Sequence, residues 1–124
     1  MATKKVLIAE DSSVIQNLTR KILEFQNFEI KTVKNGKEVL KSLEKDSFDI
    51  ILLDINMPLM DGMECAKSIR KLEDKEKSGI PIVAITGNAR NYSDQDFHDA
   101  GINEFLPKPL DFDKLVETVK KWTD

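Results

Sequence analysis

Short apolar runs recur along this 124-residue chain, and after each run the apolar residues are spaced as on one face of a helix. The runs lie near residues 5–9, 29–33, 49–53, 80–86 and 103–106. Strands that alternate with helices in this way pair in parallel, because each helix carries the chain back to the same edge of the sheet. The pattern therefore predicts one α/β domain over residues 1–124, a doubly wound sheet of five parallel strands.

The expected helices differ in how clearly their ends are marked. In the first helix, four apolar residues at helical spacing are predicted to face the core: Ile15, Leu18, Ile22 and Phe25. The charged segment 71–78 could either extend the third helix or form a loop. The other helices are expected to start near these signals: the cap from Asn35 to Glu38, then Gly62, Ser93 and Asp111.

Charge and composition exclude several classes of protein. The formal net charge is -3 with both signs interspersed, which gives no basic surface for nucleic acid. No apolar stretch is long enough to cross a bilayer, and the chain starts without a signal-peptide core. Cys65 is the single cysteine, so no intramolecular disulfide can form. We therefore expect a cytoplasmic domain that binds neither DNA nor a membrane directly.

Acidic side chains follow two of the predicted strands. Asp54 comes directly after the apolar run 50–53, and Glu10 and Asp11 come directly after the first strand. Because parallel strands end at a common edge, these three side chains are predicted to lie close together. Such a cluster either binds a hard cation or raises its own pKa values by mutual repulsion.

Four motifs occur in order at the predicted strand ends. They are the Glu10-Asp11 pair, Asp54 with the later Met57-Pro58-Leu59-Met60-Asp61-Gly62, then Ile85-Thr86-Gly87, and finally Phe105-Leu106-Pro107-Lys108-Pro109. Together they resemble the receiver domain of bacterial response regulators, the CheY-like family, over essentially the whole chain. The resemblance implies a flavodoxin-like three-layer sandwich with strand order 2-1-3-4-5.

The resemblance also implies a function in two-component signal transduction. Asp54 is expected to accept a phosphoryl group from a sensor histidine kinase or a histidine phosphotransfer protein, as carboxylate nucleophiles do elsewhere. Thr86 and Lys108 are expected to bind oxygens of that group. The domain would then catalyse only its own phosphorylation and dephosphorylation, and would not be an enzyme acting on other substrates.

A magnesium ion is the cofactor that the resemblance implies. Its ligands would be Glu10, Asp11, Asp54 and the backbone carbonyl of Asn56, and Mg²⁺ favours such oxygen ligands together with water and phosphate. The family also implies that Asn56 and Asn88 flank the phosphoryl group and influence its lifetime.

A conformational switch is the expected output. Thr86 would move toward the phosphoryl group and leave space for Phe105, so that the surface of the fourth helix, fifth strand and fifth helix changes for a downstream partner. Phe105 has no hydroxyl, so its outward state would depend on apolar contact alone. The resemblance further implies a cis bond between Lys108 and Pro109, which an X-Pro bond permits.

Three other functions remain open from the residues. One is a flavin-binding protein of the same fold, although the acids in the Glu10-to-Ser13 loop would then face a phosphate without a metal. An Mg²⁺-dependent phosphohydrolase with an aspartate nucleophile would use a second acid near Asp54, where this chain has Asn56. A binding module that is never phosphorylated would have lost one of the acids or the lysine, and none is lost here. The start of the chain favours a free-standing protein, whereas the Ile85-to-Ala89 stretch favours a receiver from a hybrid histidine kinase.

Overall fold

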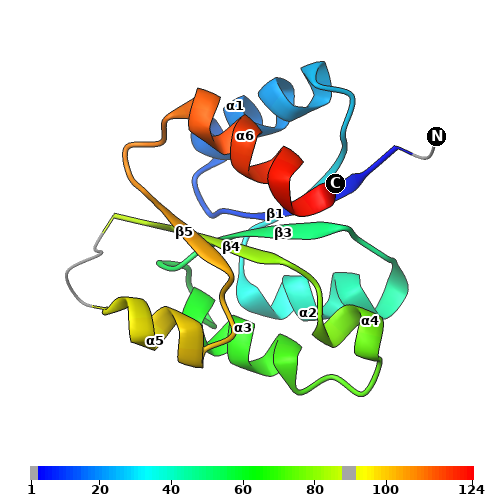
Figure 1. The fold of residues 1–124 in the computed structure, drawn as a ribbon, viewed down its shortest axis with the longest axis vertical. Helices are drawn as coiled ribbons and strands as arrows, with labels where there is room; N and C mark the ends of the chain where they lie inside the picture. Colours follow the sequence, from blue (N-terminus) through cyan, green and yellow to red (C-terminus); the bar gives the residue numbers. More distant parts are fainter. Residues whose placement is uncertain (1–2, 88–91) are drawn as a thin grey trace.

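The computed structural model describes residues 3–87 and 92–124 and contains one parallel five-stranded sheet (Figure 1). The strand order is β2-β1-β3-β4-β5, so the predicted doubly wound topology is confirmed. The strands fall within two residues of the predicted runs: β1 Lys5–Ala9, β2 Glu29–Val33, β3 Ile50–Asp54, β4 Ile82–Thr86 and β5 Glu104–Pro107. All residues of β3 and β4 are buried, because helices cover both faces of these central strands.

Helices form the two outer layers of the sandwich. Their bounds are α1 Ser13–Phe25, α2 Gly36–Lys45, α3 Gly62–Arg70, α4 Lys75–Ser78, α5 Asp94–Asp99 and α6 Phe112–Thr123. In Figure 1, α1 and α6 lie on one side of the sheet and the other helices lie on the opposite side. The buried residues form two apolar clusters accordingly, one on each face of the sheet.

Side-chain caps mark the helix starts that the sequence predicted. The Asn35 side chain accepts a hydrogen bond from the N–H of Glu38 at 2.9 Å. Ser93 and Asp96 form a reciprocal capping box at the start of α5. Neither interpretation of segment 71–78 was complete, since α3 ends at Arg70 and residues 75–78 form the separate helix α4, which Asp74 caps. The predicted switch surface therefore corresponds to α5, β5 and α6.

The predicted inner face of α1 was wrong at Leu18 and Phe25, whereas Ile15 and Ile22 are half-buried. Phe25 is 85 % exposed and Leu18 is 45 % exposed, whereas the buried residues of α1 are Gln16, Thr19 and Leu23. Both buried polar side chains donate hydrogen bonds to backbone carbonyls, which offsets the cost of removing them from water. Apolar spacing alone could not identify this face, because two of its three buried residues are polar.

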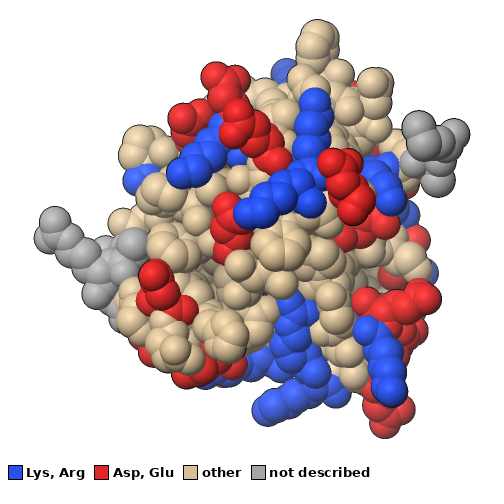
Figure 2. Space-filling model, viewed as in Figure 1, with Lys and Arg blue, Asp and Glu red and all other residues tan. Residues whose placement is uncertain are grey.

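The surface carries both signs of charge. Figure 2 shows lysine, arginine, aspartate and glutamate side chains interspersed over the face in view. Within residues 3–87 and 92–124, none of the helices combines the length and the apolar character needed to span a membrane.

Gly62 brings the start of α3 against the end of β3. Its N–H donates to the carbonyl of Ile55 at 2.9 Å. A Cβ atom at this position would lie 2.6 Å from the carbonyl oxygen of Asp54 and 2.7 Å from the Cα of Ile55. The segment after Asp54 therefore depends on the absence of a side chain at residue 62.

Replacing Gly62 should disturb this segment. We expect Gly62→Ala to lower the free energy of unfolding by about 1–3 kcal/mol, because a backbone atom must move to admit the methyl group. Urea denaturation measures the change. Gly79→Ala is the matched control, since its Cβ would meet only the carbonyl of Lys75, at 3.1 Å. Equal losses of stability in the two variants would contradict the close-approach argument.

Candidate functional site

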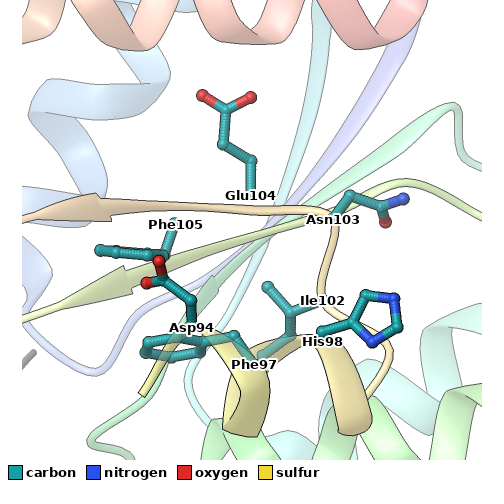
Figure 3. A pocket seen from close by; sticks show the side chains of 7 residues that line it. All are labelled: Asp94, Phe97, His98, Ile102, Asn103, Glu104 and Phe105. Atoms are coloured by element: carbon teal, nitrogen blue, oxygen red, sulfur yellow. The ribbon is translucent and has the colours of Figure 1, made fainter. Parts of the chain in front are cut away.

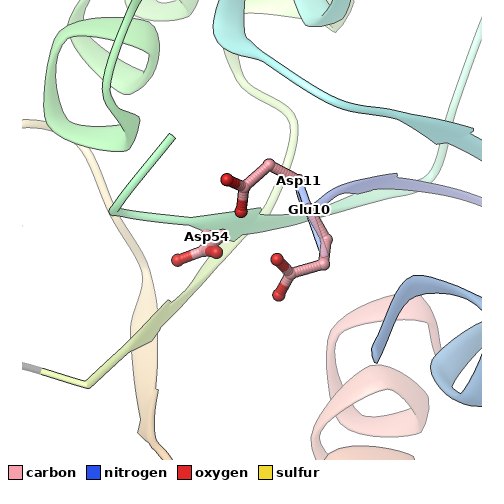
Figure 4. Close-up of side chains that lie close together, drawn as sticks. All are labelled: Glu10, Asp11 and Asp54. Carbon is pink, nitrogen blue, oxygen red and sulfur yellow. The ribbon is translucent and has the colours of Figure 1, made fainter. Parts of the chain in front are cut away.

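Three carboxylates converge at the carboxyl edge of the sheet. Glu10 and Asp11 follow β1 and Asp54 ends β3, and one oxygen of each lies within 4.8 Å of the others (Figure 4). Figure 4 shows the three side chains pointing into a shared space. The predicted convergence is therefore present, because β1 and β3 are adjacent parallel strands.

Within the described residues, two donors from different parts of the chain bind the Asp54 carboxylate. The Nζ of Lys108 lies 3.2 Å from each carboxylate oxygen of Asp54. The N–H of Asn56 donates to Oδ1 of Asp54 at 3.1 Å. The Asp54 side chain is 1 % exposed and the Lys108 side chain 28 % exposed, so the ion pair is largely shielded from water. An ionised, oriented carboxylate of this kind is a suitable nucleophile.

Glu10 is the member of the cluster with one carboxylate oxygen left without a partner among the described residues. Its Oε2 accepts the N–H of Ser12 at 2.9 Å, while Oε1 is buried without a hydrogen-bond partner among the described residues. Burial raises the pKa of Glu10 to about 7, the Ser12 N–H opposes this, and the nearby Asp54 carboxylate adds to it. In the metal-free site Glu10 therefore takes up a proton near neutral pH.

The donor set fits a hard divalent cation. Among the described residues, three carboxylates face one ammonium group, that of Lys108, so this part of the site keeps an excess of negative charge when the carboxylates are ionised. The buried Oε1 of Glu10 has no hydrogen-bond partner within residues 3–87 and 92–124, and a cation would satisfy it. Carboxylate oxygens in this number are ligands that Mg²⁺ accepts while retaining water.

Thr86 and Phe105 lie on the face of the sheet that α3 and α5 cover. Phe105 is the register partner of Ala84, and both pack in the cluster on that face. Thr86 is two residues beyond Ala84 on the same strand, so its side chain lies on the same face of the sheet. Thr86 is 1 % exposed, and its carbonyl accepts the N–H of Lys108 at 2.9 Å. The end of β4 is thus tied to the loop that carries the lysine.

The structure brings together most of the site residues that the sequence predicted. Asn88 lies outside the described residues. The Lys108-Pro109 bond is cis, as the resemblance implied. Sequence reasoning missed Ser12, which donates to Glu10, and Gln16, whose side chain donates to the Glu10 carbonyl at 3.0 Å. The only signal for Gln16 was a polar residue next to the apolar stripe of a predicted helix.

Comparisons with known proteins agree with the fold and the motifs. A family model described as the response regulator receiver domain matches residues 6–120. The chemotaxis response regulator CheY4 of Vibrio cholerae has a similar structure, with a TM-score of 0.87, 28 % identity, and coverage of 98 % of this chain and 99 % of that one. The receiver domain of the sensor histidine kinase PA1611 from Pseudomonas aeruginosa, solved with a coordinated magnesium ion, is also similar. Its TM-score is 0.88 and its sequence identity 29 %, and the match covers 98 % of both chains.

Curated relatives include receivers within larger sensor kinases. The hybrid signal transduction histidine kinase M of Dictyostelium discoideum is 37 % identical over 119 residues, which cover 94 % of this chain. The CAI-1 autoinducer sensor kinase/phosphatase CqsS of Vibrio cholerae is 34 % identical over 119 residues, covering 96 % of this chain. The match spans 5 % of the first relative and 17 % of the second.

The raised pKa of Glu10 predicts how stability depends on pH without metal. The unfolded carboxyl ionises near its ordinary value of 4.5 and the folded one near 7, so stability is lost as pH rises through this window. With a chelator present, Glu10→Gln should therefore be more stable than the wild type by about 1–3 kcal/mol at pH 8. The difference should vanish below pH 4.5, where Glu10 is protonated in both states.

Urea denaturation at several pH values measures this difference. Glu117→Gln, which removes a carboxylate at an exposed position of α6, is the matched control. A constant difference between Glu10→Gln and the wild type from pH 4 to pH 8 would contradict the assignment of the titration to Glu10.

Proposed function

The chain belongs to the family of response regulator receiver domains, and we propose that residues 1–124 form one such domain, whose Asp54 accepts a phosphoryl group. The donor is the phosphohistidine of a sensor histidine kinase or of a histidine phosphotransfer protein. The observation that carries this proposal is the buried Asp54 carboxylate, paired with Lys108 and adjacent to two further acids. The hybrid-kinase relatives support a partner of this kind.

The transfer is a displacement at phosphorus. An oxygen of Asp54 forms the new O–P bond as the P–N bond to the donor imidazole breaks, and the imidazole nitrogen retains the electron pair and takes up a proton. Lys108 already reaches both oxygens of Asp54, so its ammonium group can pair with phosphoryl oxygens after a small movement. The Thr86 hydroxyl is the proposed donor to another phosphoryl oxygen.

Glu10, Asp11 and Asp54, with the backbone carbonyl of Asn56, are the groups that would hold Mg²⁺. When bound, the ion would neutralise charge on the carboxylates and on the incoming phosphoryl oxygens. Two similar structures support this choice: the PA1611 receiver contains coordinated magnesium, and the response regulator TrrA of Thermotoga maritima, 34 % identical with a TM-score of 0.84 over 97 % of this chain and 99 % of its own, was solved with Mg²⁺-BeF.

Phe105 is the proposed link from the site to a partner surface. Its ring stacks on Phe97 of α5, with centroids 4.7 Å apart (Figure 3). The two rings line a groove of about 290 Å³ between α5 and β5, which also includes His98. When Thr86 moves toward the phosphoryl group, Phe105 turns toward the space that it leaves, and the stack on Phe97 is lost. Phosphorylation then changes the α5, β5 and α6 surface by favouring the conformer that pairs its charge better.

The domain acts as a signalling switch in the cytoplasm and catalyses only the phosphorylation and dephosphorylation of its own aspartate. Its downstream partner would bind the face that carries the groove beside Phe105. The face seen in Figure 2 carries both signs of charge and offers no basic surface for nucleic acid, so a protein partner is proposed.

Removing the nucleophile tests the proposal directly. Incubation with acetyl phosphate and Mg²⁺ should add the mass of one phosphoryl group to the wild type, and Asp54→Asn should abolish this adduct because an amide cannot form the acyl phosphate. Intact-mass spectrometry gives the result. A chelator should also prevent labelling.

Asp61→Asn is the matched control, because Asp61 is a nearby exposed acid that caps α3 and asparagine caps equally well. It should be labelled like the wild type. Labelling of Asp54→Asn at the wild-type rate would show that the nucleophile is a different residue.

Lys108→Ala should separate labelling from switching. We expect the fold to persist, labelling to slow on the order of 10-fold, and the phosphorylation-dependent NMR shifts of Phe97 and Phe105 to shrink, since the phosphoryl group loses its cation. Lys114→Ala, at an exposed position of α6, should behave like the wild type. Shifts of full size in phosphorylated Lys108→Ala would refute the proposed role of the lysine.

A further inference from the structure

Gln16 lies at the base of the acidic pair, and we propose that it is a positioning residue for the cation site. Its carboxamide holds the turn after β1 so that the Glu10 and Asp11 carboxylates face Asp54. This inference rests on the proposed function, because it concerns how the same site binds its cation. Gln16 does not belong to the three-carboxylate cluster, and it would act through the backbone of that cluster.

The Gln16 side chain makes two buried hydrogen bonds to the backbone. Its Nε2 lies 3.0 Å from the carbonyl oxygen of Glu10 and 3.0 Å from the carbonyl oxygen of Val33. Both neighbours are acceptors only, so the amide nitrogen must face them and both of its protons are used. The residue is 7 % exposed, which leaves little access for water to replace these bonds.

The same two carbonyls mark the place where the sheet stops. The register of β1 with both neighbouring strands ends at Ala9. One further backbone bond follows, in which the N–H of Glu10 donates to the carbonyl of Val33 at 3.0 Å. Gln16 donates to that same carbonyl and to the carbonyl of Glu10, so it continues the connection between β1, β2 and α1 beyond the last ladder pair.

Fixing the Glu10 carbonyl constrains Asp11. The carbonyl belongs to the planar peptide unit that joins Glu10 to Asp11, so its direction sets the direction in which the chain leaves Glu10. Rotation of this unit would swing the Asp11 carboxylate away from Asp54 and would alter the approach of the Glu10 side chain. The Ser12 N–H that binds Glu10 Oε2 follows in the same turn. The affinity for the cation should therefore depend on the carboxamide of Gln16, because groups that orient metal ligands commonly affect metal affinity.

A purely structural role is the competing explanation, and α1 provides a control for it. Thr19 is 2 % exposed on the same buried face, and its hydroxyl donates to the carbonyl of Ile15 at 2.8 Å, within the helix itself. Thr19→Val removes a buried hydrogen bond of α1 without touching the turn that carries the acids. Gln16→Met keeps an unbranched side chain of similar size but removes both donors.

The test compares Mg²⁺ binding by isothermal titration calorimetry in the wild type, Gln16→Met and Thr19→Val. We expect the dissociation constant for Mg²⁺ to rise on the order of 10-fold in Gln16→Met and to stay within about twofold in Thr19→Val. In acetyl phosphate labelling, the Mg²⁺ concentration for half-maximal rate should rise by the same factor in Gln16→Met. The rate at saturating Mg²⁺ should approach that of the wild type.

An unchanged dissociation constant in folded Gln16→Met, or an equal rise in Thr19→Val, would overturn the inference. If Gln16→Met fails to fold, NMR on the wild type tests the inference instead. The Gln16 side-chain amide signals should shift during Mg²⁺ titration with the same midpoint as the backbone amides of Glu10 and Asp11, and unmoved signals would overturn it. A wild type that binds no Mg²⁺ would overturn the proposed function as well. If the wild type binds Mg²⁺ and is labelled at Asp54, and Gln16→Met binds Mg²⁺ equally well, only this inference is overturned.

Discussion

Glu10, Asp11 and Asp54 bring three carboxylates within 4.8 Å of one another, and Lys108 opposes them with one ammonium group. Their mutual repulsion is the constraint on which the rest of the site depends. In the metal-free protein it is reduced in two ways, by the ion pair to Asp54 and by the raised pKa of Glu10, which lets that side chain hold a proton near pH 7. A bound cation would relieve the same repulsion, and this links metal binding, protonation and stability at one edge of the sheet.

The backbone around the cluster is fixed by close contacts that leave little freedom. Gly62 allows the start of α3 to approach the Asp54 carbonyl, and the N–H of Asn56 turns back onto the Asp54 side chain. On the other side, Gln16 connects the carbonyls of Glu10 and Val33. Under the proposed function the site would bind a cation and then a phosphoryl group, and holding the ligands in place beforehand would help, because reorganising them would subtract from the binding free energy.

Strand β5 connects the site to both outer layers. Lys108 follows this strand and pairs with Asp54, while the Phe105 ring stacks on Phe97 of α5. Glu104 points to the opposite side of β5 from Phe105 (Figure 3). It accepts hydrogen bonds from two side chains of α6, Trp122 Nε1 at 2.9 Å and Lys121 Nζ at 3.0 Å. A movement of β5 would therefore alter contacts with both α5 and α6, and this gives the proposed switch surface a physical basis that includes both helices.

The sequence by itself determined the order of the elements and the convergence of the acids, because alternating apolar runs and helical segments permit a parallel sheet whose strand ends share one edge. It also predicted the cap at Asn35 and a helix start near Ser93, because the donors that these side chains bind lie within one helical turn. Only the tertiary structure decided which face of α1 is buried, since Gln16 finds an acceptor at Val33, seventeen residues away. The raised pKa of Glu10 likewise follows from burial and from Asp54 on another strand. The spacing of apolar residues identifies a helix or a strand. The burial and the electrostatic environment of a side chain depend on residues distant in sequence, which come into contact only in the folded protein.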